Sequence, residues 1–273
     1  MSILVAGHYC HDTLIGNDSI HRTLGGSAAY VSAILQALGE AHAVVAKVGS
    51  DFLYAGQVGH PPIVVAGRTT AFVDDYRGPE RRGRVEAVAP AIEPEDLQGS
   101  WEIGVACAIA GELPLRTLRR LRQICRTVLA DAQSVVREIG ASGEVRLRAP
   151  APEALELFDV LKANREEAAV LDVPALRRRS TLLITDGARG SAILRGDLEL
   201  HVPAQLAREK DPTGAGDSFL AGLAAGLRQG MPIESAARMA AWCGARAVEH
   251  VGVPRLTADE VRTCPTPPGT RSR

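Results

Sequence analysis

The sequence predicts an α/β fold in which helices flank a doubly wound, mostly parallel sheet. Short apolar runs bounded by polar residues, such as "ILVAGH" at 3–8, are typical of buried strands. From about residue 100 onward, such runs alternate with helical patterns, as in βα units with right-handed crossovers. With 273 residues, of which 46% are hydrophobic and 23% charged, the chain fits one large globular domain or two small ones.

The elements follow one another along the chain. Besides the run at 3–8, we expect strands at 42–49, 60–67, 103–109, 127–131, 159–163 and 181–185. We expect helices at 25–39, 114–125, 215–229 and 232–248, and a hairpin at 190–202 that turns at Gly196–Asp197. We assign 1–273 to a single domain, with the Pro-rich segment 263–273 as a mobile tail.

The segment 69–90 has a different β pattern. Two β-prone runs with polar faces flank a charged turn that contains Gly78, Pro79 and Gly83. Because this pattern is unlike that of the buried strands, we expect the segments at about 12–24 and 68–90 to form a small β-strand lid inserted in the domain.

Charge and cysteine content limit the classes of partner. Lys and Arg total 31 and Asp and Glu 32, a net charge of −1, which does not indicate a nucleic-acid or membrane surface. The five cysteines form no C-x-x-C pair, and Cys107, Cys125 and Cys243 lie in apolar runs, as buried thiols do. The start "MSILVAGHYC" has no basic, apolar leader, and no run approaches the roughly 18 apolar residues of a membrane span. We therefore expect a cytoplasmic protein.

The segment "DPTGAGDSFLAG" at 211–222 carries the clearest chemistry. Gly214 and Gly216 stand at a helix start, where backbone N–H groups and the helix dipole favour an anion. Asp217 stands in the same turn, and one explanation is that it only complements the dipole, which contributes about 0.3–1 kcal/mol. The other is that a carboxylate beside a phosphate deprotonates an acceptor hydroxyl. A Walker P-loop is absent, and the nearest lysine in sequence, Lys210, precedes the loop.

The segment "DPTGAGDSF" matches, nearly completely, the C-terminal signature of the ribokinase-like (PfkB) carbohydrate kinases, and the chain resembles this family. Further similar segments follow in that family's order: "LGGSAAYVSAILQALG", "KVGSD" at 47–51, "NREEA" at 164–168 and "TDGARGS" at 185–191. The resemblance covers about residues 3–254 and implies a ribokinase-like fold.

The resemblance also implies roles for individual residues. Asp217 would be the general base, and the anion hole would be formed by Gly214, Ala215 and Gly216. The nucleotide would lie along the residues Thr185, Gly187, Thr213, Gly214 and Gly216. Asn164 and Glu167 would act on the Mg²⁺–phosphate arrangement through water, although their spacing alone is equally that of a capping box at a helix start.

The segment "GHYCHD" at 7–12 suggests a metal site at first sight, because His8, Cys10 and Asp12 would share one face of an extended chain. Zinc sites usually draw their ligands from two separated pairs, and the sequence offers no second pair. The resemblance instead implies that Asp12 binds substrate hydroxyls, with the backbone of Gly25 and Gly26 against the same substrate.

One position departs from the family pattern, because Tyr30 stands where the family usually has an Asn that contacts a sugar hydroxyl. The chain also shortens the region between Asp51 and His60. Both departures, and phrases such as "LVAGHYCHDTLI", are similar to the plant myo-inositol 3-kinases. A flat ring of hydroxyls suits an acid such as Asp12 and an apolar wall such as Tyr30.

The resemblance therefore implies an enzyme that transfers the γ-phosphoryl group of ATP to a hydroxyl of myo-inositol, with Mg²⁺ as cofactor. A monovalent cation such as K⁺ stays open, as does the choice between monomer and homodimer. Two alternatives also stay open: a kinase for another sugar or nucleoside, and a catalytically weak member that acts as a binding or regulatory protein.

Overall fold

A large sheet forms the centre of the computed structural model, which describes residues 2–17, 19–75, 77–78 and 82–265. The sheet has eight strands, in the order β16 (Leu198–Val202), β15 (Ser191–Arg195), β14 (Thr181–Thr185), β13 (Val160–Asn164), β10 (Cys125–Asp131), β9 (Trp101–Ala106), β1 (Ile3–Ala6) and β4 (His42–Val45). The strands from β14 to β4 are parallel, and β15 and β16 form the antiparallel hairpin expected at 190–202. The expectation of a mostly parallel sheet is confirmed.

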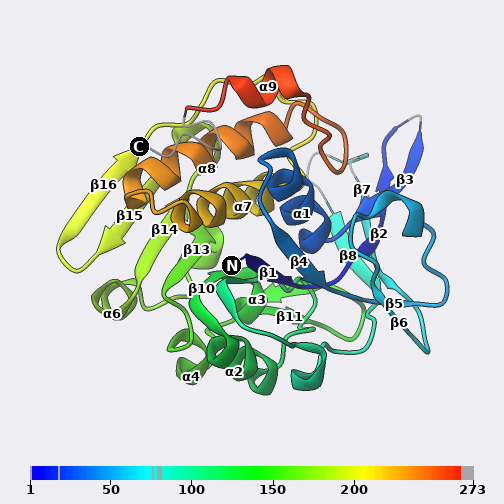
Figure 1. Ribbon diagram of the computed structural model, residues 1–273. Coiled ribbons are helices and arrows are strands. Elements are labelled where there is room, and N and C mark those ends of the chain that lie inside the picture. Colours follow the sequence, from blue (N-terminus) through cyan, green and yellow to red (C-terminus); the bar gives the residue numbers. More distant parts are fainter. Residues whose placement is uncertain (1, 18, 76, 79–81, 266–273) are drawn as a thin grey trace.

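Helices cover both faces of this sheet (Figure 1). One face carries α1 (Ser27–Ala37), α7 (Ala215–Arg228) and α8 (Ile233–Ala247), and the other carries α2 (Leu115–Ile124), α4 (Pro152–Leu155) and α6 (Val173–Arg179). In β1, Ile3 and Val5 pack into the first layer, while Leu4 and Ala6 pack into the second. This follows from the alternation of side chains along a strand, and it explains why β1 is apolar at every position.

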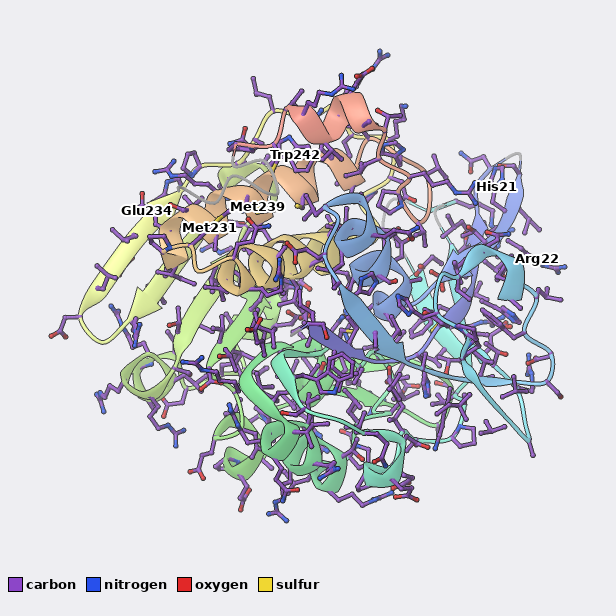
Figure 2. The ribbon with its side chains drawn as sticks, viewed as in Figure 1. His21, Arg22, Met231, Glu234, Met239 and Trp242 are labelled. Atoms are coloured by element: carbon purple, nitrogen blue, oxygen red, sulfur yellow. The ribbon has the colours of Figure 1, made fainter. Side chains whose placement is uncertain are left out.

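The helices α7 and α8 approach each other closely because small residues line their contact. A β-carbon added to Gly222 would lie 2.6 Å from the Cys243 sulfur and 2.9 Å from the Ala240 Cα. Met239 and Trp242 are buried side chains of α8 in the same layer (Figure 2). The Trp242 Nε1–H donates a hydrogen bond to the Thr263 hydroxyl (3.2 Å), which ties α8 to the segment that follows α9 (Ala258–Arg262).

A second sheet projects from the side of the molecule and is separate from the large one (Figure 1). Its strands run in the order β3 (Ile20–Gly25), β2 (Cys10–Ile15), β7 (Thr70–Asp75) and β8 (Arg82–Ala87), with His21 and Arg22 on its outer strand β3 (Figure 2). These strands fall in the segments where a lid was expected, at about 12–24 and 68–90. We refer to them as the lid sheet; that they close over a site stays a prediction.

Two parts of the chain differ from expectation. The strand expected at 42–49 is divided into β4 and β5 (Lys47–Gly49), and β5 pairs with β6 (Ile63–Val65) in a small sheet of its own. The break falls at Ala46, and the next residue is Lys47, whose buried amine donates to the Ala91 carbonyl and pairs with Asp96 at 2.6 Å. The antiparallel pair β11 (Arg137–Ile139) and β12 (Val145–Leu147) was not expected.

Several short elements connect these strands and helices. They are η1 (Ala55–Gln57), η2 (Pro94–Asp96), α3 (Gln133–Val136), α5 (Arg165–Ala168) and η3 (Gly187–Arg189). Of the expected mobile tail at 263–273, Cys264 is buried in the core, and 266–273 lie outside the described residues. None of the helices in the described part of the chain is long and apolar enough to span a membrane.

Replacing Gly222 with Ala should destabilise the fold. The added methyl group meets Cys243 and the Ala240 backbone, and overpacking typically costs about 1–3 kcal/mol. This exceeds the gain of up to about 1 kcal/mol in helix propensity. Denaturant unfolding of Gly222→Ala, compared with Gly56→Ala, where nothing lies within 4 Å of an added β-carbon, measures the difference. A Gly222→Ala protein as stable as the wild type would contradict this account of the α7–α8 contact.

Candidate active site

A pocket of about 260 Å³ opens where several parallel strands end. Asp131 and Asn164 line it at the carboxyl ends of β10 and β13, and the first turn of α7 also lines it. Asp12 and Asp74 line it from the lid sheet. The carboxyl ends of parallel strands are the usual place for ligands in open α/β sheets. The pocket therefore brings together residues of the segment 212–217 and Asp12, which lie far apart in the sequence.

The first turn of α7 has the geometry of an anion site. Gly214 is the N-cap residue with a φ of 74°, which a residue with a side chain rarely adopts. A β-carbon at Gly214 would also collide with the ring of Tyr30, so the loop packs directly on that ring. The N–H groups of a helix's first turn have no partner within the helix. The N–H of Ala215 donates to the Pro212 carbonyl at 3.3 Å, which makes it a weaker anion donor than those that follow.

Asp217 is half-buried in this turn and held by polar neighbours. The side-chain amide of Gln133 donates to Asp217 Oδ1 at 3.3 Å and to the Ser27 hydroxyl at 2.9 Å. Burial, followed by the nearby carboxylate of Asp131, raises the pKa of Asp217 above its ordinary value, while Ser27 and Lys162 act in the opposite direction. A carboxylate with a raised pKa that faces a pocket is a better proton acceptor than an exposed one.

A lysine reaches this turn from β13. The Lys162 amine pairs with Asp131 at 2.8 Å, and both side chains are buried. A β-carbon on Gly216 would lie 2.6 Å from the Lys162 amine, so the positive charge sits directly beneath the candidate anion hole. Burial disfavours the charged amine, but the carboxylates of Asp131, Glu167 and Asp217 together outweigh burial and raise the pKa of Lys162. The site thus has the lysine that the loop sequence itself lacks.

Asn164 and Glu167 form a capping box at the start of α5 and also line the pocket. The Glu167 N–H donates to Asn164 Oδ1 at 2.8 Å, and the Asn164 N–H donates to Glu167 Oε2 at 2.9 Å. The structural explanation of the N-x-x-E spacing is therefore confirmed. Glu167 is also buried, and Arg137 lies 3.8 Å from its other oxygen. Burial and then Asp131 raise the pKa of Glu167.

The other half of the pocket holds the residues expected to bind the acceptor. Asp12, Gly26 and Tyr30 line it. Gly25 lies beside them, because a β-carbon there would overlap the Asp12 carboxylate. Gly26 has a φ of 90°, and a β-carbon there would collide with the His8 carbonyl. The two glycines thus allow Asp12 and the start of α1 to occupy the same small space.

The residues expected along the nucleotide are placed in two ways. Thr213 and the first turn of α7 line the pocket. Thr185 is the last residue of β14 and pairs in register with Asn164, so it lies next to the pocket without lining it. Gly187 follows at the start of η3 with a φ of 51°. Thr185 and Gly187 thus lie at and just after the carboxyl end of β14, the strand next to β13.

The segment "GHYCHD" does not form a metal centre. His8 is fully buried, shares a hydrogen bond of 2.8 Å between its Nδ1 and the Thr70 hydroxyl, and has its pKa lowered chiefly by burial. Among the described residues, no group of three or more His, Cys, Asp or Glu side chains could hold a metal ion by itself.

Several residues of the pocket were not expected from the sequence. They are Ser27, Phe72, Asp74, Ile109, Asp131, Gln133, Arg137 and Lys162. A signal was available for two of them: Asp131 and Lys162 are charged residues inside or at the end of runs that otherwise read as buried strands. A charge in such a run is costly unless it is paired, which points to a partner on a neighbouring strand.

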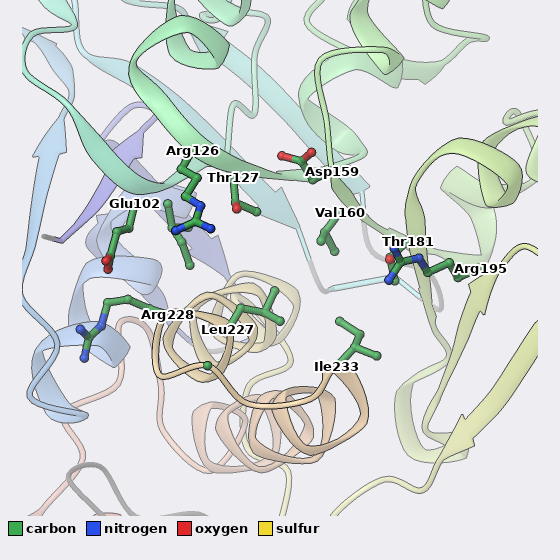
Figure 3. A pocket seen from close by; sticks show the side chains of 12 residues that line it. Glu102, Arg126, Thr127, Asp159, Val160, Thr181, Arg195, Leu227, Arg228 and Ile233 are labelled. Carbon is green, nitrogen blue, oxygen red and sulfur yellow. The ribbon is translucent and has the colours of Figure 1, made fainter. Parts of the chain in front are cut away.

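A larger pocket, of about 600 Å³, lies at the opposite end of the sheet (Figure 3). Its lining includes Thr127, Val160 and Thr181, near the amino ends of β10, β13 and β14, and Arg228 at the end of α7. None of the site residues expected from the sequence is among its described lining residues. Asp12 and Asp217 line the smaller pocket instead.

The comparisons with known proteins identify the family of the chain. The model of the pfkB family carbohydrate kinases matches residues 103–258. The chain is 40% identical over 276 residues to the inositol 3-kinase of Zea mays, and the match covers 92% of this chain and 73% of that protein. It is 36% identical over 270 residues to the inositol 3-kinase of Arabidopsis thaliana, covering 93% of this chain and 76% of that protein.

Solved structures confirm the ribokinase-like fold. A pyrophosphate-dependent kinase in the ribokinase family, complexed with a pyrophosphate analog and myo-inositol, has a TM-score of 0.81 at 20% identity, covering 95% of this chain and 99% of that one. The ribokinase of Thermotoga maritima has a TM-score of 0.73 at 18% identity, covering 93% and 94%. On the strength of the family match and the identity to the plant enzymes, this chain belongs to the pfkB family of carbohydrate kinases.

Proposed function

We propose that this protein transfers the γ-phosphoryl group of ATP to a hydroxyl group of myo-inositol, with Asp217 as the general base. Its family makes it a phosphotransferase that acts on an alcohol group. The observation that carries the proposal is that one small pocket holds Asp217, the first turn of α7 and Asp12 together. The names of its plant relatives support myo-inositol as the acceptor.

The geometry supports a direct in-line transfer. The acceptor would bind between Asp12 and Tyr30 and place one hydroxyl against the Asp217 carboxylate. Asp217 would take the proton of this hydroxyl while its oxygen forms a bond to the γ-phosphorus, and the bond from that phosphorus to the leaving oxygen of ADP breaks. The N–H groups at the start of α7 and the Lys162 amine, 2.6 Å from the β-carbon position of Gly216, would stabilise the charge on the transferred group.

The oxygen donors in the pocket fit a divalent cation that arrives with the phosphates. Mg²⁺ is usually held by one or two carboxylates, waters and substrate phosphates rather than by a cage of protein ligands. Asn164 and Glu167 would hold it through water, and Glu167 lines the pocket although its carboxylate also caps α5. When bound, the cation would neutralise charge on the phosphoryl group. The adenosine part of ATP would follow Thr213, Thr185 and Gly187.

The identity of the acceptor is tested with a panel of myo-inositol, ribose, fructose and adenosine at saturating Mg-ATP. We expect kcat/KM to be highest for myo-inositol. Asp12→Ala should raise the KM for myo-inositol strongly, because a buried hydroxyl left without a partner loses about 1–3 kcal/mol. Tyr30→Asn should weaken myo-inositol more than it weakens ATP.

The outcomes of this panel separate the alternatives. If ribose, fructose or adenosine exceeds myo-inositol tenfold or more, the acceptor is wrong but the kinase assignment stands. If no acceptor is phosphorylated and ATP is not bound, a binding or regulatory role replaces the proposal. Repeating the assay with pyrophosphate in place of ATP identifies the donor, and repeating it with and without K⁺ tests for a monovalent cation.

Replacing Asp217 with Asn should reduce kcat by about 10²–10⁴-fold while leaving ATP binding and folding intact, because general-base removal has this magnitude. Glu234→Gln is a matched control, since Glu234 also stands in the first turn of a helix, α8. If Asp217 only complemented the helix dipole, both variants would keep nearly full activity. An Asp217→Asn protein with more than about a tenth of the wild-type kcat would therefore refute its role as base.

Replacing Lys162 with Met should change the pH dependence of kcat/KM. Asp217 accepts a proton only when it is ionised, so activity falls as the pH falls through its pKa. Burial raises this pKa and Lys162 lowers it, so loss of Lys162 should move the acidic limb of the profile to higher pH. Breaking a buried ion pair also costs about 3–5 kcal/mol of stability. Lys210→Met, at an exposed lysine, should move neither the limb nor the unfolding midpoint; an unmoved limb in Lys162→Met would contradict the electrostatic link.

A further inference from the structure

The lid sheet presents a second carboxylate to the pocket. Asp12 on β2 pairs in register with Phe72 on β7, and Asp74 follows Phe72 by two residues. Side chains two residues apart lie on the same face of a strand, so Asp12, Phe72 and Asp74 face the pocket together, and all of them line it. Asp75 points to the opposite face, where it binds Arg77.

A glycine on a neighbouring strand makes room for each carboxylate. Gly25 on β3 lies beneath Asp12, and a β-carbon there would overlap the carboxylate. Gly83 on β8 pairs in register with Asp74, and a β-carbon there would lie 2.7 Å from Asp74 Oδ1. A glycine next to a carboxylate therefore occurs on both edge strands of the lid sheet, β3 and β8. Any side chain at Gly25 or Gly83 would push a carboxylate out of its place.

The second carboxylate, that of Asp74, is buried, and so is that of Asp12. The exposed fraction of Asp74 is 4% and that of Asp12 is 8%, and a carboxylate buried to this degree is costly unless hydrogen bonds satisfy it. Both residues also interact with other protein groups. An ionised carboxylate offers about four acceptor positions, and a ligand hydroxyl would occupy one of them.

We infer that Asp74 is a second acceptor-recognition residue, which accepts a hydrogen bond from one hydroxyl of a cyclic polyol while Asp12 accepts from another. The two residues are diagonal neighbours, roughly 8 Å apart at Cα for strands in register. Phe72 lies between them and provides an apolar surface for the face of a ring. Gripping two hydroxyls at once fixes the rotation of the ring, and therefore decides which hydroxyl reaches Asp217.

This inference rests on the proposed kinase activity, and its test uses the full-length protein with Mg-ATP and myo-inositol. Asp74→Asn should raise the KM for myo-inositol by about 10- to 100-fold, since a hydrogen bond to a charged group is lost. The KM for ATP should stay within about twofold. Asp75→Asn is the matched control, because it removes the same charge from the opposite face of the same strand; it should leave both constants within about twofold.

Two further measurements distinguish recognition from a structural role. Gly83→Ala keeps Asp74 but displaces it, and should raise the KM for myo-inositol as well, whereas Gly16→Ala, where an added β-carbon lies 3.5 Å from the nearest atom, should not. A panel of deoxy-inositols, each lacking one hydroxyl, is then compared between wild type and Asp74→Asn. Removing the hydroxyl bound by Asp74 should weaken the wild type but hardly affect the variant, while Asp12→Ala should lose its sensitivity to a different hydroxyl.

These results test the proposed function and the role of Asp74 separately. If the wild type phosphorylates no polyol, the proposed function fails. If the wild type phosphorylates myo-inositol but the Asp74→Asn protein has an unchanged KM, or if every deoxy analogue weakens both proteins equally, the role of Asp74 is refuted and the kinase assignment stands. An equal rise in KM for Asp75→Asn would also refute it, because charge on the lid sheet, and not its position, would then be responsible.

Discussion

The Lys162–Asp131 ion pair lies at the point where the large sheet, the helix α7 and the pocket meet. The two residues are partners in register on β13 and β10, and this pairing places their charged groups 2.8 Å apart. The Lys162 amine also lies next to Gly216. Its positive charge offsets the negative charge of the Glu167 and Asp217 carboxylates. A charge of this kind is stable in a protein interior only when it is paired. The charge balance around Asp217, the first turn of α7 and the capping box therefore depends on one strand pairing.

The sequence was sufficient for features that depend on local order. The apolar runs gave the central strands, and Gly214 before the run at 215–229 gave the start of α7, where the structure has a φ of 74°. The division of 42–49 could not be foreseen, because its two parts pair with different strands: β4 pairs with β1 and β5 pairs with β6. Its alternative, one continuous strand, satisfies every local preference equally well.

In the candidate site, residues within sequence motifs could be predicted, whereas residues placed there by strand pairing could not. Asp12 and Asp217 stand in short motifs, so their chemistry could be inferred from their neighbours. Gln133 stands in no motif, yet its amide connects Asp217 to Ser27. Asp74 likewise stands in a segment that the sequence shows only as β-prone. Its position near Asp12 follows from the register of β7 with β2. Residues of this kind become visible only when the pairing of strands is known.

The strand β1, which lies next to the edge strand β4 of the large sheet, is also the first strand of the chain. Ile3 pairs in register with His42 on one side and with Ile103 on the other. During synthesis β1 can therefore pair with β4 early, but its other edge stays open until β9 has left the ribosome. Parallel pairing over such a sequence separation is slow, and an open apolar edge invites association with other chains. The time needed to synthesise residues 46–106 thus sets how long this edge of β1 stays unpaired.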